Sequence, residues 1–247
     1  MVLVKGYKNM KRIWITGGGS GIGAEMAKIY AKEGHNVFIS GRNKNKLEKV
    51  SPNVTIIPCD ITNIKQVKKA IKKMHSLDLA ILNAGVYFPG KSIETNILEY
   101  KKTMEVNYFG TLNCLLEIIP IMKSKRGHIA VVSSLAGYRG LPNASAYGSS
   151  KAALINLCES MKAELESYPI KLQVINPGFV KSPMTKRNNF DMPYLMEPKL
   201  AAIKIIEGLK KDKFEIAFPK PLVRRIKILR LLPYNLYFYL IKKIIKK

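Results

Sequence analysis

A glycine-rich stretch near the amino end, residues 17–23 (GGGSGIG), constrains the fold of this chain more than any other feature. It follows residues 12–16, which predict a short buried strand, and it precedes residues 24–33, which have the spacing of an amphipathic helix. Glycines at such a turn let a ligand approach the backbone closely, and the amino end of a helix attracts phosphate groups. Strand, glycine turn and helix in this order predict a dinucleotide-binding unit, whereas glycines without those flanks would indicate only a tight turn.

A second feature is a tyrosine four residues before a lysine, Tyr147 and Lys151, in a segment that predicts a helix over residues 144–167. On a helix these side chains share one face, and a nearby ammonium lowers the pKa of a phenol toward neutral pH. Ser134 follows an apolar run, residues 129–132, that predicts a buried strand. Its hydroxyl is therefore expected at the carboxyl end of that strand, where ligands bind in open α/β sheets. The pair alone would more often be ordinary neighbours on a helix surface.

Together these motifs resemble the classical short-chain dehydrogenase/reductase family. The glycine turn has the spacing T-G-x-x-x-G-x-G that is typical of the family, and Asn-Ala-Gly at residues 83–85 also matches it. The resemblance implies that the cofactor-binding residues are Gly17, Gly19, Ser20, Gly21, Ile22, Gly23, Arg42, Asp60, Ile61, Asn83, Ala84, Gly85, Tyr147, Lys151, Pro177, Gly178, Val180 and Ser182.

The resemblance also implies catalytic roles for Asn107, Ser134, Tyr147 and Lys151. Tyr147 would exchange a proton with the alcohol or alkoxide oxygen, and Ser134 would orient the carbonyl oxygen. Lys151 would lower the pKa of the tyrosine and hold the nicotinamide ribose, while the backbone at Asn107 would anchor a water of the proton relay. An asparagine within a helix is locally unfavourable, so a helix kink with a satisfied amide is the alternative for Asn107.

The residues after the second predicted strand, 36–40, indicate which dinucleotide is bound. A carboxylate here would bind the ribose 2′-hydroxyl of NAD, whereas an arginine accommodates the 2′-phosphate of NADP. Gly41 occupies the acidic position and Arg42 follows it, so we expect NADP, with NAD as the alternative. Ser20, where many NADP-dependent relatives carry a basic residue, leaves that alternative open. By the resemblance Asp60 borders the adenine ring, although Asp60 or Thr62 could instead cap the helix predicted over residues 64–74.

Strands alternating with helices predict one α/β domain, residues 1–218, followed by a helical tail, residues 219–247. The family resemblance implies a Rossmann-like, doubly wound parallel sheet with the strand order 3-2-1-4-5-6-7. Further helices are expected over residues 95–119 and 197–209. The seven expected strands are residues 12–16, 36–40, 54–58, 77–82, 128–133, 171–175 and 214–218.

The amino-acid composition limits the kinds of partner that we expect this protein to bind. A net charge of +25 would suit nucleic acid, but the basic residues are spread along the chain without a recognisable reader motif, so we expect none. The three cysteines and three histidines are isolated, which argues for reduced thiols and against a metal centre. The first twelve residues lack a signal-peptide core, so a cytoplasmic protein is expected.

Two segments suggest apolar partners. Residues 184–196 mix methionine and aromatic side chains in the region that closes over substrate in the family, which favours an apolar substrate over an ordinary packed loop. In the tail, Tyr237, Leu240, Ile241 and Ile244 share one predicted helix face, with Lys242, Lys243 and Lys246 on the other. We favour peripheral contact of this helix with an anionic membrane surface on its cytoplasmic side, and packing on the domain or on a second subunit is the alternative.

These features predict an NADP(H)-dependent oxidoreductase that interconverts a carbonyl and an alcohol, with an apolar or lipid-like substrate. Reduction of 3-oxoacyl groups on a carrier protein is the alternative within the enzyme class, since a basic surface suits an acidic carrier. A non-catalytic nucleotide-binding scaffold at the membrane is the alternative outside it. The family resemblance also implies a homo-oligomer, either a dimer or a tetramer.

Overall fold

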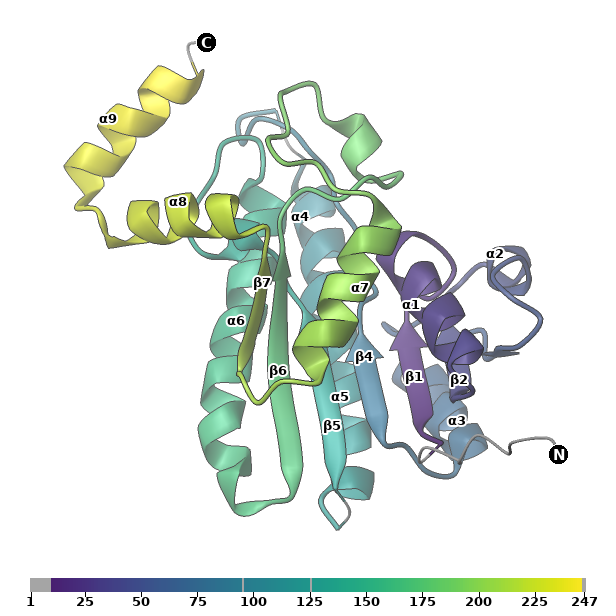
Figure 1. The fold of residues 1–247 in the computed structure, drawn as a ribbon. Helices are drawn as coiled ribbons and strands as arrows, with labels where there is room; N and C mark the ends of the chain where they lie inside the picture. The colour runs from purple at the N-terminus through teal and green to yellow at the C-terminus, as the bar shows by residue number, and fades with distance from the viewer. Residues whose placement is uncertain (1–9, 95, 125, 246–247) are drawn as a thin grey trace, which may run out of the picture.

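The computed structural model describes residues 10–94, 96–124 and 126–245, and the side chains of this part as far as residue 243. It contains a parallel seven-stranded sheet in the order β3-β2-β1-β4-β5-β6-β7, with helices on both faces (Figure 1). The predicted doubly wound α/β fold and strand order are therefore confirmed. The strands are β1 (Arg12–Thr16), β2 (Asn36–Ser40), β3 (Thr55–Ile56), β4 (Leu79–Leu82), β5 (Gly127–Val132), β6 (Ile170–Pro177) and β7 (Glu215–Phe218).

Two apolar cores enclose the sheet. Side chains of the central strands alternate between the two faces: Trp14 packs in one core and Ile15 in the other, and neither is exposed. Burial of both faces explains why these strands are almost continuously apolar. Helices α3, α5 and α6 cover the first core, and α1 and α7 the second. The helices are α1 (Gly21–Lys32), α2 (Lys44–Glu48), α3 (Ile64–Met74), α4 (Ile97–Met104), α5 (Gly110–Met122), α6 (Ser145–Glu164), α7 (Pro198–Leu209), α8 (Lys220–Leu231) and α9 (Tyr234–Ile245).

The strand order reverses between β1 and β4, which lie side by side with their carboxyl ends at the same edge of the sheet. In such folds the crevice at this switch point binds the ligand. The turn from β1 into α1 and the residues after β4 and β5 all lie at this edge. The fold therefore places the glycine turn and the predicted catalytic residues together.

Some element boundaries differ from the prediction. Strand β3 contains only Thr55–Ile56, because it is an edge strand whose continuation reaches Pro58, a residue without a backbone donor. The helix predicted over residues 95–119 is divided into α4, a π-helical turn (Glu105–Phe109) and α5, and its first residue lies outside the described part. The helix predicted over residues 144–167 ends as a 3₁₀ turn, Leu165–Ser167.

The tail forms two helices, α8 and α9, beside the carboxyl ends of the strands (Figure 1). Tyr237 and Ile241 from the predicted apolar face are buried, at 3% and 8% exposure, and Tyr237 contacts Arg139 and Gly140 of the domain. The alternative of packing on the domain therefore holds for Tyr237, whereas Ile244 and Lys246 of the same prediction lie outside the described side chains. Within the part of the chain that is described, no helix is both long and apolar enough to span a bilayer.

Candidate active site

Ser134 begins a tight turn directly after β5. It is the N-cap of a 3₁₀ turn, Leu135–Gly137, and its Oγ accepts a hydrogen bond from the backbone N–H of Ala136 at 3.1 Å. The same hydroxyl lies 3.5 Å from the backbone carbonyl of Pro177, at the end of β6, to which it donates. Two neighbouring strand ends therefore fix the position of the serine hydroxyl.

Tyr147 and Lys151 lie one turn apart on α6, as the spacing predicts. The Nζ of Lys151 is 5.6 Å from the centroid of the Tyr147 ring, and a side-chain hydrogen bond connects Tyr147 with Ser134. Lys151 is itself buried and donates from Nζ to the carbonyl of Val132 at 2.8 Å. The structure thus brings Ser134, Tyr147 and Lys151 into one cluster at the carboxyl edge of the sheet.

The electrostatics of this cluster differ from the expectation. Burial raises the pKa of Tyr147 to about 12, although its hydrogen bond with Ser134 acts in the opposite direction. Burial also lowers the pKa of Lys151 to about 8, because its ammonium has left water and faces neutral groups. Desolvation dominates the pKa of Tyr147 in this arrangement, and the ammonium of Lys151 bonds to a backbone carbonyl, so the lowering of the tyrosine pKa by the lysine stays a prediction.

Asn107 lies in the π-helical turn between α4 and α5 and is fully buried. Its Oδ1 accepts from the N–H of Val86 at 2.8 Å, and its Nδ2 donates to the carbonyl of Val86 at 3.0 Å and to Ser150 Oγ at 2.9 Å. These bonds satisfy the amide and so offset the cost of asparagine inside a helix. A Cβ added to Gly85 would lie 3.1 Å from Asn107 Oδ1 and 3.7 Å from Lys151 Nζ, so Asn107 and Lys151 flank this glycine.

The glycine turn has the shape that a dinucleotide cradle requires. Gly17 has a φ of +65°, and a Cβ there would lie 2.8 Å from the Cα of Ala84. A Cβ on Gly23 would lie 2.4 Å from the carbonyl oxygen of Gly17 and 2.7 Å from Asn83 Nδ2. Side chains at these positions would collide with the end of β4 and with the turn itself, so glycine keeps the tight strand-to-helix turn that suits a bound dinucleotide.

Hydrogen bonds hold the end of β4 against this turn. Asn83 donates from Nδ2 to the carbonyls of Thr16 and Gly17 at 3.2 and 3.3 Å. The hydroxyl of Thr16 accepts from the N–H groups of Asn83 and Ala84 at 2.9 and 3.1 Å. Thr16 is thus a further residue that positions the cradle; its place in the glycine motif was the sequence signal for it.

The loop after β6 extends over the glycine turn. A Cβ added to Gly21 would lie 4.0 Å from the Cβ of Ser182, which shows that this serine faces the amino end of α1. Ser182 Oγ accepts from the N–H of Thr185 at 3.2 Å. Val180 is buried and pairs with Met196, and Gly178 donates its N–H to Phe218 at 2.8 Å. Of the predicted residues of this loop, Ser182 is therefore the one with a contact distance to the glycine turn.

The residues predicted to surround the adenosine end lie at the ends of β2 and β3. Arg42 is exposed directly after β2, Ser20 is exposed in the glycine turn, and a Cβ on Gly19 would lie 3.4 Å from the Cβ of Lys46 in α2. Asp60 Oδ1 accepts from the backbone N–H and the hydroxyl of Thr62 at 3.0 and 2.8 Å, whereas the cap of α3 is Asn63. The alternative that Asp60 or Thr62 caps this helix is therefore wrong.

The remaining predicted cofactor-binding residues are Ile61 and Ile22. The side chain of Ile61 is buried in the apolar core, where a Cβ on Gly110 would lie 2.7 Å from its Cγ1. Ile22 lies in the first turn of α1 and is partly exposed.

Tyr87 is an aromatic neighbour of Tyr147 that was not predicted from the sequence. The rings of Tyr87 and Tyr147 meet edge to face, with centroids 5.0 Å apart. Tyr87 donates its hydroxyl to Asn188 Oδ1 at 2.8 Å, and burial raises the pKa of Tyr87. Its position two residues after Asn-Ala-Gly, at a strand end, was the signal that could have identified it.

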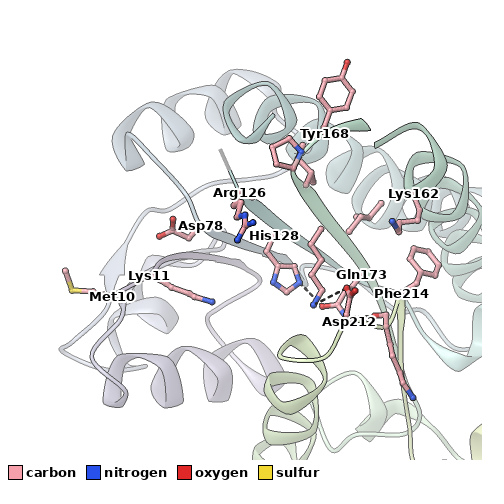
Figure 2. Close-up of a pocket in the computed structure, with 16 residues that line it drawn as sticks. Met10, Lys11, Asp78, Arg126, His128, Lys162, Tyr168, Gln173, Asp212 and Phe214 are labelled. Carbon is pink, nitrogen blue, oxygen red and sulfur yellow. Dashed lines mark hydrogen bonds and ion pairs between the residues drawn. The ribbon is translucent and has the colours of Figure 1, made fainter. Parts of the chain in front are cut away.

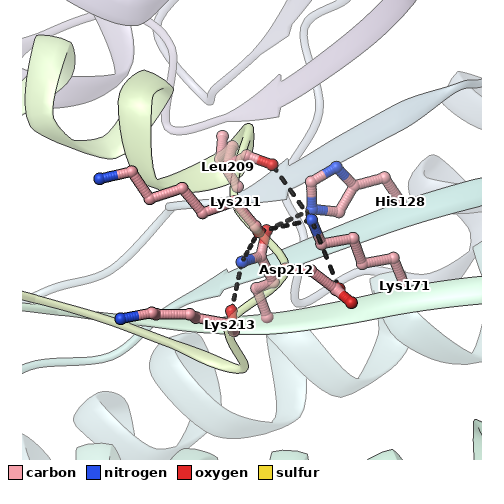
Figure 3. A network of polar contacts seen from close by, with 7 residues as sticks. His128, Lys171, Leu209, Lys211, Asp212 and Lys213 are labelled. Atoms are coloured by element: carbon pink, nitrogen blue, oxygen red, sulfur yellow. Dashed lines mark hydrogen bonds and ion pairs between the residues drawn. The ribbon is translucent and has the colours of Figure 1, made fainter.

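A cavity of about 1160 Å³ lies away from this cluster, at the amino edge of the sheet (Figure 2). His128 at its base is hydrogen-bonded to Gln173 Oε1 at 2.7 Å, and burial lowers the pKa of His128 to about 4. Nearby, Lys171 donates from Nζ to the carbonyls of Lys211 and Leu209 at 2.6 and 3.3 Å (Figure 3). These polar groups form hydrogen bonds within this network, and none of them belongs to a residue that was predicted for the site.

Comparison with known proteins agrees with the fold and the motifs. The family model for short chain dehydrogenase matches residues 11–193, so the chain belongs to the short-chain dehydrogenase family. It is 34% identical over 238 residues to an uncharacterized oxidoreductase of Myxococcus xanthus, covering 90% of this chain and 93% of that protein. It is 31% identical over 251 residues to a 3-ketodihydrosphingosine reductase of Dictyostelium discoideum, covering 85% of this chain and 75% of that protein.

Among solved structures, a short chain dehydrogenase from Burkholderia cenocepacia in complex with NADP has a TM-score of 0.85 and 27% identity. The match covers 94% of this chain and 97% of that one. A short chain dehydrogenase/reductase from Burkholderia phymatum, crystallised with NAD, shares the fold at a TM-score of 0.81 and 20% identity, over 88% of this chain and 92% of that one. The chain is therefore an NAD(P)-dependent oxidoreductase of this family that acts on CH–OH groups.

Proposed function

We propose that this enzyme interconverts a carbonyl and an alcohol with NADP(H), using Tyr147 as the proton donor and acceptor. The observation that carries the proposal is the cluster of Ser134, Tyr147 and Lys151 beside a glycine cradle at one edge of the sheet. The nicotinamide ring, when bound, supplies or accepts the hydride. A phenol whose pKa is held near 12 stays protonated at neutral pH and so carries the proton that a developing alkoxide would take.

The residues of this chain would act as follows. Ser134 donates a hydrogen bond to the carbonyl oxygen and fixes it beside Tyr147, which gives that oxygen its proton as negative charge develops. The buried ammonium of Lys151 favours the phenolate that remains and binds the ribose next to the nicotinamide. Asn107 holds the π-helical turn beside Gly85 and Lys151, where its backbone is suited to anchor a water that returns a proton to the lysine.

The cofactor is proposed to lie between the glycine turn and the loop after β6. Gly17, Gly19, Ser20, Gly21, Ile22 and Gly23 would receive the pyrophosphate at the amino end of α1, with Ser182 on the other side. The nicotinamide side would be supported by two segments: Asn83, Ala84 and Gly85 after β4, and Pro177, Gly178 and Val180 after β6. The adenine side would be lined by Asp60 and Ile61. We propose NADP over NAD because the exposed Arg42, at the end of β2, offers a cation for a 2′-phosphate.

An apolar, lipid-like carbonyl compound is the proposed substrate. Tyr87 packs on Tyr147, and Phe190, Tyr194 and Leu195 are exposed, at 38%, 42% and 38%, on the loop that follows β6. The name of the Dictyostelium relative, a 3-ketodihydrosphingosine reductase, points to a long-chain 3-keto lipid as one member of this class. Reduction of 3-oxoacyl groups on a carrier protein remains the second candidate, because the net charge of +25 suits an acidic partner.

We propose that residues 1–218 form the catalytic domain and that the tail, residues 219–247, brings it to an anionic membrane surface. The supporting observation is the outward side of α8 and α9, where Ile228, Leu231, Phe238 and Tyr239 are exposed by 60%, 83%, 54% and 56%. The tail has nine basic residues and no acidic one, which suits anionic lipid. We propose a cytoplasmic enzyme that is peripheral at the membrane and assembles as a dimer or tetramer, as is common in the family.

The catalytic proposal is tested by offering the purified chain a panel of ketones. The panel contains long-chain 3-keto lipids, a 3-oxoacyl carrier protein and small ketones, each with NADPH and with NADH, and the nicotinamide absorbance is followed. We expect turnover of the lipid-like ketones with NADPH. NADPH binding without consumption across the whole panel would instead support a non-catalytic nucleotide-binding scaffold and contradict the proposal.

The membrane proposal is tested by sedimentation with vesicles. The full chain is expected to sediment with vesicles that contain phosphatidylglycerol, and less with purely zwitterionic ones. The double variant Leu231→Ser, Phe238→Ser should lose most of this binding, whereas Tyr168→Ser, an exposed aromatic residue of the cavity at the amino edge, should retain it. Equal sedimentation of all three proteins would contradict membrane contact through the tail.

A further inference from the structure

The turn that begins at Ser134 lies against the two tail helices. The guanidinium of Arg139 is 4.5 Å from the ring centroids of both Tyr234 and Tyr237 at the start of α9. Arg139 also donates to the backbone carbonyls of Arg230 and Leu232 at 3.3 and 3.4 Å, at the end of α8. The arginine therefore fills the junction between α8 and α9 with two ring contacts and two charge-assisted hydrogen bonds.

Further contacts join the same turn to the tail. The Tyr237 hydroxyl donates to the carbonyl of Gly140, next to Arg139. On the other side, the Tyr138 hydroxyl donates to the carboxylate of Glu215 in β7, and Lys227 of α8 donates to the other oxygen of that carboxylate. Asn176 donates to the same carboxylate at 2.9 Å. Three consecutive residues, 138–140, are thus held by the tail and β7.

The turn is short and tightly connected to the catalytic cluster. Gly137 donates its N–H to the carbonyl of Ser134 at 3.0 Å, and Tyr138 donates to Leu135 at 3.1 Å. A Cβ on Gly137 would lie 2.8 Å from the backbone carbonyl carbon of Lys151, so the turn packs directly on α6. With so few residues between Ser134 and Arg139, a shift at the held end is transmitted to the serine hydroxyl.

We propose that Arg139 is a positioning residue, through which the tail holds the turn 134–140 and thereby keeps Ser134 aligned with Tyr147. The inference rests on the proposed function, since it concerns the same serine. Loss of the clamp leaves the glycine cradle untouched, because that cradle belongs to β1, α1 and β4. It loosens Ser134, weakens its hydrogen bond to Tyr147, and so raises the pKa of the tyrosine.

The test compares Arg139→Ala and Arg139→Lys with Arg224→Ala, which removes an exposed arginine of α8. The amides of residues 135–140 should exchange with deuterium faster in Arg139→Ala than in the wild type or in Arg224→Ala. For a ketone that the wild type reduces, Arg139→Ala should lower kcat by about tenfold, because a small misplacement of a reacting group is costly. Its Kd for NADPH should not change, and the pH profile of alcohol oxidation should move to higher pH.

Arg139→Lys should recover part of kcat, since it keeps the charge near the rings but loses the paired donors to the two carbonyls. Unchanged exchange at residues 135–140 in Arg139→Ala would overturn the clamp even if the wild type reduced no ketone of the panel. Slower turnover with a parallel loss of NADPH binding and thermal stability would also overturn it, because it would indicate a general structural role. Failure of the wild type to turn over any carbonyl contradicts only the proposed function, and the exchange measurement still decides the clamp.

Discussion

Each edge of the sheet carries a basic side chain whose pKa burial lowers, and the two differ in consequence. At the carboxyl edge, burial lowers the pKa of Lys151 to about 8 beside Tyr147 and Ser134. At the amino edge, burial lowers the pKa of His128 to about 4, and this histidine lies in a cavity of about 1160 Å³ (Figure 2). If an active site were chosen only by cavity volume and by the size of a pKa shift, the amino edge of the sheet would be chosen.

The difference lies in what each group faces. His128 is paired with Gln173 at 2.7 Å, within a network that bonds the neighbouring lysine to backbone carbonyls (Figure 3). Lys151 faces the phenol of Tyr147 and lies beside Gly85, at the edge where the strand order reverses. A perturbed pKa therefore marks burial, and only the neighbouring reactive groups and the strand polarity distinguish a catalytic site.

The largest expected effect concerns the cradle at the carboxyl edge. Gly23→Ala would put a Cβ 2.4 Å from the carbonyl oxygen of Gly17, which forces the turn out of shape. We expect NADPH affinity to fall by at least about 100-fold, measured by fluorescence titration. The control is Gly140→Ala, where the added Cβ meets nothing within 4 Å. Equal NADPH affinity in the two variants would argue against the glycine turn as the cofactor site.

Ser134→Ala is expected to affect turnover and spare binding. Its oxygen is held by the Ala136 N–H, and its hydrogen would turn from the distant Pro177 carbonyl to the substrate oxygen, so the substitution removes a positioned donor with little change in packing. We expect kcat to fall by about 100-fold, with NADPH Kd unchanged. His128→Gln at the other edge should keep full turnover. A comparable loss in both variants would remove the distinction between the two edges.

Arg42→Ala is expected to have a smaller and cofactor-specific effect. The exposed guanidinium is proposed to bind the 2′-phosphate, so we expect the KM for NADPH to rise by about tenfold while the KM for NADH stays within about twofold. Arg126→Ala, an exposed arginine at the amino edge, should change neither value. An equal change in the KM for NADPH and for NADH would indicate that Arg42 does not bind the 2′-phosphate.

The amino edge is expected to show a pH dependence of stability and no effect on turnover. His128 has a lowered pKa of about 4 in the folded state against about 6.5 when unfolded, so the unfolded state binds more protons between these values. As the pH falls from 6.5 to 4, the wild type should lose up to about 1.4 kcal/mol of unfolding free energy per pH unit relative to His128→Gln, measured by urea unfolding. A constant difference between the two proteins would show that His128 is not buried as a neutral group.

Much of the fold followed from local patterns. Apolar strands alternating with helices predicted the elements, and the glycine motif predicted the cradle around Gly17 and Gly23, because both depend on residues close together in the sequence. The cluster of Ser134, Tyr147 and Lys151 was also predictable, since helix spacing and strand polarity bring these residues to one place.

Features that depend on contacts between distant segments were not predictable. The π-helical turn at Asn107 depends on bonds to Val86 and Ser150, and the contact of Tyr87 with Tyr147 depends on how a loop folds over α6. The raised pKa of Tyr147 follows from burial, which spacing alone does not reveal. The sequence pattern identified an apolar tail helix, but not that Tyr237 faces inward while Phe238 faces outward.

The most direct test of the central claim is the substitution Tyr147→Phe, assayed for ketone reduction and for NADPH binding on the same preparation. The ring and its packing on Tyr87 are retained, and only the proton donor is removed. We expect turnover to fall by at least about 100-fold with NADPH Kd unchanged. Turnover equal to that of the wild type would contradict the assignment of Tyr147 as the catalytic acid.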